Sequence, residues 1–150
     1  KHRRRQRQMC IRDSISGGKL MMESAMEALK GTNIKVFGVT ALTSLSDLDT
    51  NQIYQRTVTN QVNAMLDIAE EAKIDGVVCS PHELELVTER KSFLSITPGI
   101  RLLDVNDDQS RVMTPKQAID LGSNHIVIGR PITCAKDISE ALNKIYQSIN

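Results

Sequence analysis

The feature that most constrains this chain is the regular alternation of short apolar runs with longer amphipathic segments after residue 16. The apolar runs are continuous, as is typical of strands buried on both faces of a parallel sheet, and they span residues 34–40, 76–79, 93–96 and 125–128. The amphipathic segments carry apolar residues at helical spacing and span residues 17–30, 54–73, 80–89, 114–121 and 135–149. This order predicts repeated βα units, in which helices cover a parallel sheet.

Four strands are predicted in this way, and none is expected before residue 34. A (β/α)8 barrel needs eight strands in about 250 residues. The 150 residues therefore predict the C-terminal half of a (β/α)8 TIM barrel, an α/β fold with four parallel strands and covering helices, or a small open sheet if the chain is complete. Residues 44–54 are expected to form a loop with a short helical turn, and residues 102–112 a long polar loop.

The N-terminal segment differs from the rest of the chain in charge. Residues 1–14 carry a net charge of +5, whereas residues 15–150 carry −4. Such an arm either binds nucleic acid or is a solvated, disordered tail, and the lack of aromatic residues among its arginines favours the tail. A third interpretation is preferred, because Gln8–Ser14 resembles translated sequencing-adapter sequence. Residues 1–14 are thus expected to be a basic non-native or disordered arm, and 15–150 a partial TIM-barrel domain.

Composition excludes several classes of protein. No apolar run approaches the roughly 20 residues that span a bilayer, and no apolar stretch follows the basic N-terminus as in a secretory signal. The three cysteines are odd in number and widely spaced, which fits neither a disulfide framework nor a metal site. We therefore expect a cytoplasmic protein that uses no metal, with Cys79 and Cys134 as small core residues.

Two short segments combine a glycine and an arginine directly after a predicted strand. They are Thr97-Pro98-Gly99-Ile100-Arg101, here the first arginine corner, and Ile126-Val127-Ile128-Gly129-Arg130-Pro131-Ile132-Thr133, here the second arginine corner. Glycine lets the backbone approach an anion closely, and the arginine guanidinium offers a planar fork of donors to a phosphate. In a barrel, the loops after the last two strands commonly bind phosphate. The corners therefore predict a phosphate site, the alternative being ordinary turn residues with surface arginines.

Two further residues are candidates for ligand contacts. Gln109 lies in the long loop after the first arginine corner, where an amide can donate to a phosphate or carbonyl, or can simply be solvated. Thr43 follows the strand predicted at 34–40, and its hydroxyl can hydrogen-bond a polar ring edge or cap a helix.

The chain from about Ser16 to Ile149 resembles the C-terminal part of bacterial orotidine 5′-phosphate decarboxylases. Six segments carry the resemblance in family order: Ser16–Gly18 with Met21-Met22, Val39–Ser44, Asp75–Ser80, Thr97–Arg101, Asp108–Pro115 and Ile126–Thr133. The resemblance implies a TIM barrel that decarboxylates orotidine 5′-monophosphate (OMP) to UMP and CO2, without a cofactor or metal, in pyrimidine biosynthesis. It also implies a homodimer in the full-length family.

Carried over residue by residue, the resemblance implies that Arg101, Gln109, Gly129 and Arg130 bind the substrate phosphate and that Thr43 contacts the pyrimidine. The family's catalytic Asp-x-Lys-x-x-Asp motif does not occur in the 150 residues, so no catalytic residue can be assigned. The chain alone is therefore expected to be inactive. Two alternatives stay open: another phosphate-binding barrel enzyme, or a non-catalytic remnant whose basic arm binds nucleic acid.

Overall fold

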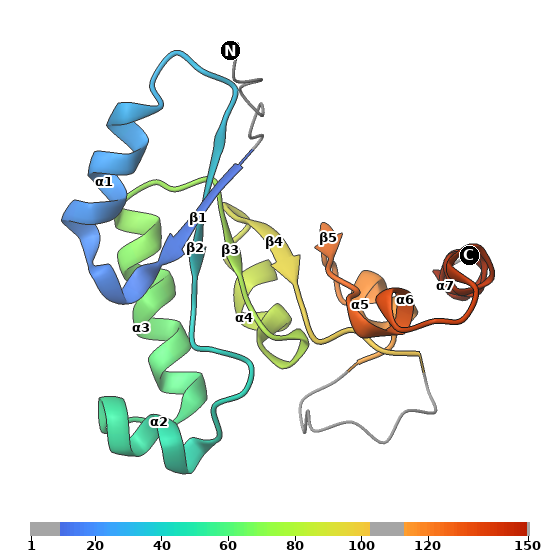
Figure 1. Ribbon diagram of the computed structural model, residues 1–150. Coiled ribbons are helices and arrows are strands. Elements are labelled where there is room, and N and C mark those ends of the chain that lie inside the picture. Colours follow the sequence, from blue (N-terminus) through green and yellow to red (C-terminus); the bar gives the residue numbers. More distant parts are fainter. Residues whose placement is uncertain (1–9, 103–112, 150) are drawn as a thin grey trace, which may run out of the picture.

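The computed structural model describes residues 10–102 and 113–149 (Figure 1). Within these residues, five strands form one parallel sheet in the order β1-β2-β3-β4-β5: β1 (Cys10–Ser14), β2 (Lys35–Val39), β3 (Gly76–Val78), β4 (Leu94–Thr97) and β5 (His125–Ile126). Each strand lies beside the strand that precedes it along the chain, so all carboxyl ends meet at one edge of the sheet. This edge faces downwards in Figure 1 for β1 to β4.

The predicted number of four strands is wrong, because β1 precedes residue 34 and lies inside the segment assigned to a basic arm. Four of its five residues are exposed, and it pairs with β2 over its full length, from Cys10 opposite Lys35 to Ser14 opposite Val39. An edge strand of this kind is held by backbone hydrogen bonds on one side and needs no apolar run. Apolar runs therefore did not predict the strand at Cys10–Ser14. The residues before Cys10 lie outside the described part of the chain.

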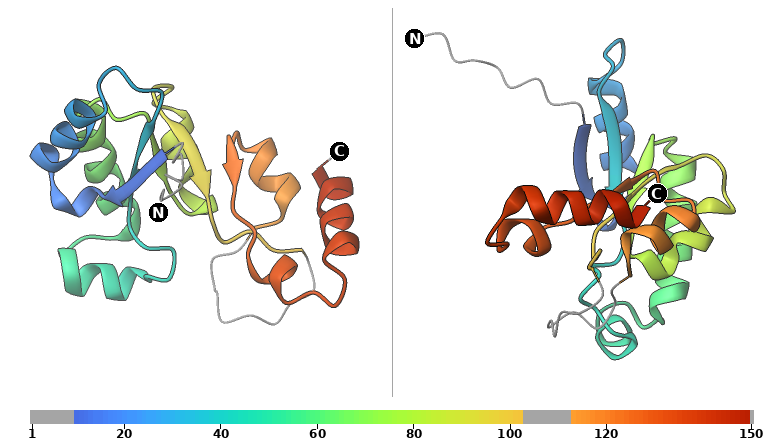
Figure 2. Two further views of the ribbon diagram at one scale, coloured as in Figure 1. Left: turned by 45° about the horizontal axis from the view of Figure 1, so that its top comes forward. Right: turned by 90° about the vertical axis from the view of Figure 1, so that its right-hand side faces the viewer.

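The described helices are α1 (Lys19–Ala28), α2 (Asp47–Tyr54), α3 (Val58–Glu71), α4 (Leu84–Thr88), α5 (Pro115–Asp120), α6 (Arg130–Thr133) and α7 (Ile138–Ile149), with short 3-10 helices η1 (Ile15–Gly17) and η2 (Pro81–Glu83). Helices α1, α3 and α4 lie over one face of the sheet, whereas α7 lies beyond β5 (Figures 1 and 2). The main core lies between this layer and the sheet, where Val62, Leu66 and Ala69 of α3 and Val77 of β3 are fully buried.

Several helix starts follow the signals read from the sequence. Ser80 caps η2 with Pro81 in its first turn, and Thr114 caps α5 with Pro115 in its first turn. The Thr114 hydroxyl accepts a hydrogen bond from the Gln117 N–H at 3.3 Å, and the Gln117 side chain accepts one from the Thr114 N–H at 3.1 Å. These reciprocal bonds satisfy donors that would otherwise be exposed at the helix end.

Other elements differ from the prediction. The short helical turn expected within the loop at 44–54 is the eight-residue helix α2, which Ser46 and Asp49 start with a capping box. The helix expected from residue 54 begins at Val58, because Gln55 adopts a left-handed conformation (φ 56°) that ends α2. The strand expected at 125–128 has two residues, and α6 follows it within the second arginine corner.

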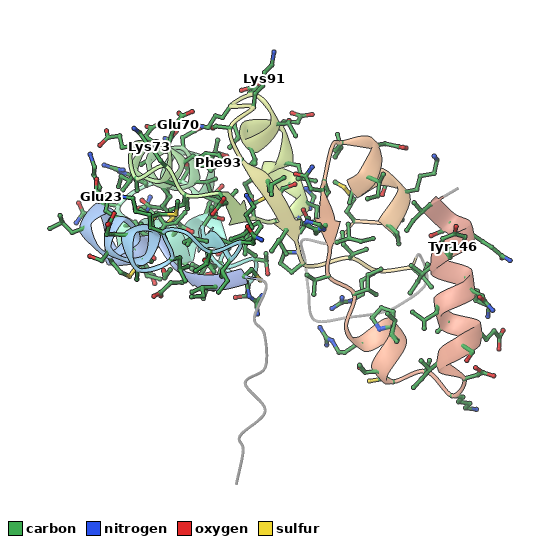
Figure 3. The ribbon with its side chains drawn as sticks, turned by 90° about the horizontal axis from the view of Figure 1, so that it is seen from above. Glu23, Glu70, Lys73, Lys91, Phe93 and Tyr146 are labelled. Carbon is green, nitrogen blue, oxygen red and sulfur yellow. The ribbon has the colours of Figure 1, made fainter. Side chains whose placement is uncertain are left out.

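Exposed apolar side chains gather on α7. Ile138, Leu142 and Tyr146 recur at four-residue intervals and are all about half exposed or more, and Figure 3 labels Tyr146 on this helix. Ala141 and Ile145 are buried on the same helix, which contacts α5 and α6. In the described part of the chain no helix has the length and apolar character needed to cross a membrane.

Candidate functional site

Both arginine corners lie at the carboxyl edge of the sheet, on neighbouring strands. The first leaves the end of β4, and the second leaves the end of β5. The pairing of Thr97 with Ile126 and the hydrogen bond from the Val127 N–H to the Thr97 carbonyl oxygen (2.8 Å) place the two corners side by side. The segments that carry Arg101 and Gly129-Arg130 therefore start side by side at this edge of the sheet.

Arg101 is held within the fold. Arg101 is 9% exposed, and its Nη1 donates to the Ile100 carbonyl oxygen at 2.9 Å. Gly99, two residues earlier, has φ +83°, a backbone conformation that glycine adopts far more readily than any other residue. The interpretation of Arg101 as a surface arginine is therefore wrong. A mostly buried guanidinium at the edge of a sheet is suited to holding an anion.

The second corner is open. Gly129 precedes α6, and a side chain built on it would meet nothing within 4 Å. Arg130 is the first residue of α6 and is exposed. Close packing within the protein therefore does not require glycine at this position. The open space beside the Gly129 backbone leaves room for a ligand.

The segment that contains Gln109 begins and ends beside the first corner. The Arg101 N–H donates to the Met113 carbonyl oxygen at 3.0 Å, and the Met113 N–H donates to the Gly99 carbonyl oxygen at 3.3 Å. These bonds join the two sides of the segment at its base. Gln109 itself lies outside the described residues.

Thr43 lies at the same edge of the sheet but farther away. It is half-buried in the loop after β2, and β3 lies between β2 and β4. Its alternative role as a helix cap is wrong, because Ser46 caps α2. The structure therefore places Thr43 on the carboxyl side of the sheet without bringing it against the arginine corners.

Of the two cysteines expected in the core, only Cys79 is there. Cys79 follows β3 and is 1% exposed, and burial raises the pKa of its thiol to about 12, with a hydrogen bond to the Thr97 side chain opposing that shift. Such a thiol is neutral and unreactive at physiological pH. Cys134 is exposed at the end of α6, so its assignment to the core is wrong. Among the described residues, no cluster of three or more histidine, cysteine or acidic side chains could hold a metal ion.

Sequence reasoning missed four polar side chains that join β4 to the turn before β5. They are Ser95, Thr97, Ser123 and Asn124, here the β4–β5 clasp, and hydrogen bonds join Ser95 to Asn124 and Thr97 to Ser123. Serine and asparagine after Gly122 read as ordinary turn residues, and neither contributes to an apolar pattern. Their pairing depends on contacts between positions 26 and 29 residues apart, which no local signal reveals.

Comparison with known proteins decides the family. The profile of the orotidine 5′-phosphate decarboxylase / HUMPS family matches residues 10–145. The chain belongs to this family. The resemblance seen in the sequence is thereby confirmed.

Relatives named orotidine 5′-phosphate decarboxylase are closely similar to the chain. One from Coxiella burnetii (strain RSA 331) is 47% identical over 144 residues, and one from Ehrlichia canis (strain Jake) is 42% identical over 139 residues. These matches cover 90% and 91% of this chain but 61% of each relative. The chain thus spans about three fifths of the length of these curated relatives.

Solved structures of the family have the same fold. The orotidine 5′-phosphate decarboxylase of Lactobacillus acidophilus aligns with a TM-score of 0.76 at 35% identity, over 95% of this chain and 63% of that one. The enzyme of Sulfolobus solfataricus aligns with a TM-score of 0.56 at 16% identity, over 93% of this chain and 72% of that one, a likeness of fold alone.

Proposed function

We propose that the chain forms the phosphate- and base-binding part of an orotidine 5′-monophosphate decarboxylase, which converts OMP to UMP and CO2. The observation that carries the proposal is the side-by-side placement of the two arginine corners, with a mostly buried Arg101 and an open Gly129-Arg130. Two guanidinium groups at neighbouring strand ends can neutralise one phosphate dianion. Membership of the family and the names of the relatives support OMP as the nucleotide.

In this proposal Arg101, Gln109, Gly129 and Arg130 bind the phosphate, and Thr43 contacts the pyrimidine ring. The loop between Leu102 and Met113 returns to the first corner, which supports a place for Gln109 at the phosphate. Contacts to a non-reacting phosphate can hold the ring in the geometry of the transition state, so that remote binding energy appears in the rate.

We further propose that the sheet is the C-terminal half of a (β/α)8 barrel. Its strands are all parallel, and each pairs with its neighbour in sequence, as in a barrel wall. Helices α1, α3 and α4 cover one face of β1 to β4, which leaves the other face of these strands for a barrel interior.

Binding of UMP tests the proposed function directly. In calorimetric titration of the 150-residue chain, UMP is expected to bind at least about ten-fold more tightly than uridine, because each charge-assisted contact to phosphate contributes about 1.5–3 kcal/mol. Ribose 5-phosphate is the control for the base and should bind more weakly than UMP. Equal affinity for UMP and uridine would contradict the phosphate site, and equal affinity for UMP and ribose 5-phosphate would favour a different phosphate-binding barrel enzyme.

The same chain is expected to release no CO2 from OMP. Decarboxylation leaves a carbanion at C6 that needs a proton donor held against it, and the Asp-x-Lys-x-x-Asp motif that supplies one in the family does not occur in these 150 residues. The measurement is release of labelled CO2, with the relative from Coxiella burnetii as the positive control. Turnover above the uncatalysed rate would overturn this prediction without affecting the phosphate site.

A further inference from the structure

The ladder between β4 and β5 is short, although β5 leads into the second arginine corner. Only two residue pairs join these strands, Ile96 with His125 and Thr97 with Ile126, whereas five pairs join β1 and β2. Two pairs of backbone hydrogen-bonding groups leave a strand free to shift or fray. Other contacts must therefore set the position of Arg130 relative to Arg101.

Buried hydroxyl groups supply the first of these contacts. The hydroxyl oxygens of Thr97 and Ser123 lie 2.7 Å apart, and the residues are 0% and 6% exposed. The Ser123 hydroxyl also donates to the His125 carbonyl oxygen at 3.1 Å. These buried hydroxyls therefore join the carboxyl end of β4 to the start of β5.

The other half of the clasp is a closed set of three hydrogen bonds. The Asn124 side-chain oxygen accepts from the Ser95 N–H at 2.8 Å and from the Ser95 hydroxyl at 3.2 Å, and the Asn124 N–H donates to the Ser95 hydroxyl at 3.0 Å. These three bonds are part-buried, whereas the bond between Thr97 and Ser123 is buried and is therefore the more costly of the two sets to break. The clasp therefore adds side-chain contacts between β4 and the turn before β5 to the two backbone pairs.

We propose that Thr97 and Ser123 are positioning residues for the phosphate site, an inference that rests on the proposed function. Thr97 is both the first residue of the first arginine corner and the anchor of β5, through its hydroxyl to Ser123 and its carbonyl to Val127. A shift of β5 therefore changes the distance between Arg101 and Arg130. Two cations converge on one phosphate only at a fixed spacing, and a displacement of about 1 Å in such a site can cost about 100-fold.

The test compares Thr97→Val, which removes the hydroxyl at nearly constant shape, with Thr97→Ser, which keeps it. Thr97→Val is expected to weaken UMP binding about ten-fold, because phosphate binding must then restore the position of β5 that the lost bond, of about 1–1.5 kcal/mol, had fixed, and to leave uridine binding unchanged. Thr97→Ser should bind UMP within about two-fold of the wild-type chain. Thr50→Val is the matched control, since Thr50 is also fully buried and its hydroxyl donates to the Ser46 carbonyl oxygen at 2.8 Å, within α2.

Loss of stability alone would lower the unfolding temperature of both Val variants and leave the ratio of UMP to uridine affinity unchanged in both. The inference is overturned if Thr97→Val binds UMP as the wild-type chain does, or if Thr97→Ser loses as much affinity as Thr97→Val. Hydrogen exchange of the Val127 amide gives a second readout that needs no ligand. We expect exchange at least about ten-fold faster in Thr97→Val than in Thr50→Val, and equal rates would also overturn the inference.

The two readouts separate this inference from the proposed function. If the wild-type chain does not prefer UMP to uridine, the phosphate site is wrong, and the role of Thr97 in positioning it is wrong with it. The Val127 exchange rate then still shows whether the clasp holds β5.

Discussion

Replacing Arg130 with alanine is expected to weaken UMP binding about 100-fold, because a bidentate guanidinium contact to phosphate contributes about 2–3 kcal/mol. Arg130 is exposed at the start of α6, so the unfolding temperature should stay within about 1 °C of the wild-type value. Uridine has no phosphate, and its affinity should not change. Calorimetric titration with both ligands measures the effect.

Two further variants sharpen the result for Arg130. Arg130→Lys keeps the charge and loses the planar fork, so an intermediate loss of about ten-fold is expected. Lys30→Ala removes an exposed positive charge from the loop before β2, at the opposite edge of the sheet, and is the control for net charge. If Lys30→Ala weakens UMP binding as much as Arg130→Ala, long-range charge rather than a phosphate contact explains the affinity.

Replacing Gly76 with alanine is expected to lower the free energy of unfolding by about 3 kcal/mol. A methyl group at this first residue of β3 would collide with the backbone carbonyl oxygen of Leu94 on β4 and lie 2.6 Å from a ring carbon of Phe37 on β2. The carbonyl belongs to the neighbouring strand and cannot move without disturbing the sheet. Urea-induced unfolding, followed by circular dichroism, measures the change.

Gly38 on β2 offers a matched control in the same sheet. The atoms nearest to a methyl group there belong to the buried Ile15 and Ile74 side chains, at 2.5–2.9 Å, and side-chain atoms move more readily than the backbone of a neighbouring strand. Gly38→Ala should therefore cost less than half as much as Gly76→Ala. Equal losses would mean that the close approach of β3 to β4 does not limit the residue at position 76.

The local parts of the fold could be read from the sequence because their causes are local. Val77 and Val78 form a strand buried on both faces, and a continuous apolar run is the direct consequence of that burial. Ser80-Pro81 and Thr114-Pro115 start helices, since each cap satisfies N–H groups only two or three residues away. The arginine corners were predicted for the same reason, as a glycine and an arginine directly after a strand.

The capping box of α2 shows a local signal that was present but not used. Ser46 and Asp49 satisfy each other's backbone donors, and this spacing predicts the start of a full helix where a loop with a short helical turn was expected. The apolar residues of α2 gave no helical pattern, because Leu48 and Ile53 do not face the core and are both more than half exposed. Capping chemistry, rather than hydrophobic periodicity, was the informative feature there.

The sequence by itself determined the parallel α/β class, the family resemblance and the chemistry of the two arginine corners, because each depends on residues adjacent in the chain. Only the tertiary structure decided that Cys10–Ser14 is an edge strand, since its pairing uses backbone groups common to every sequence. It also decided that Gly76 faces the Leu94 carbonyl and that Thr97 meets Ser123. Each of these contacts joins residues far apart in the chain. Each depends on a single donor, a single acceptor or the absence of a methyl group, so it leaves no periodic pattern in the sequence.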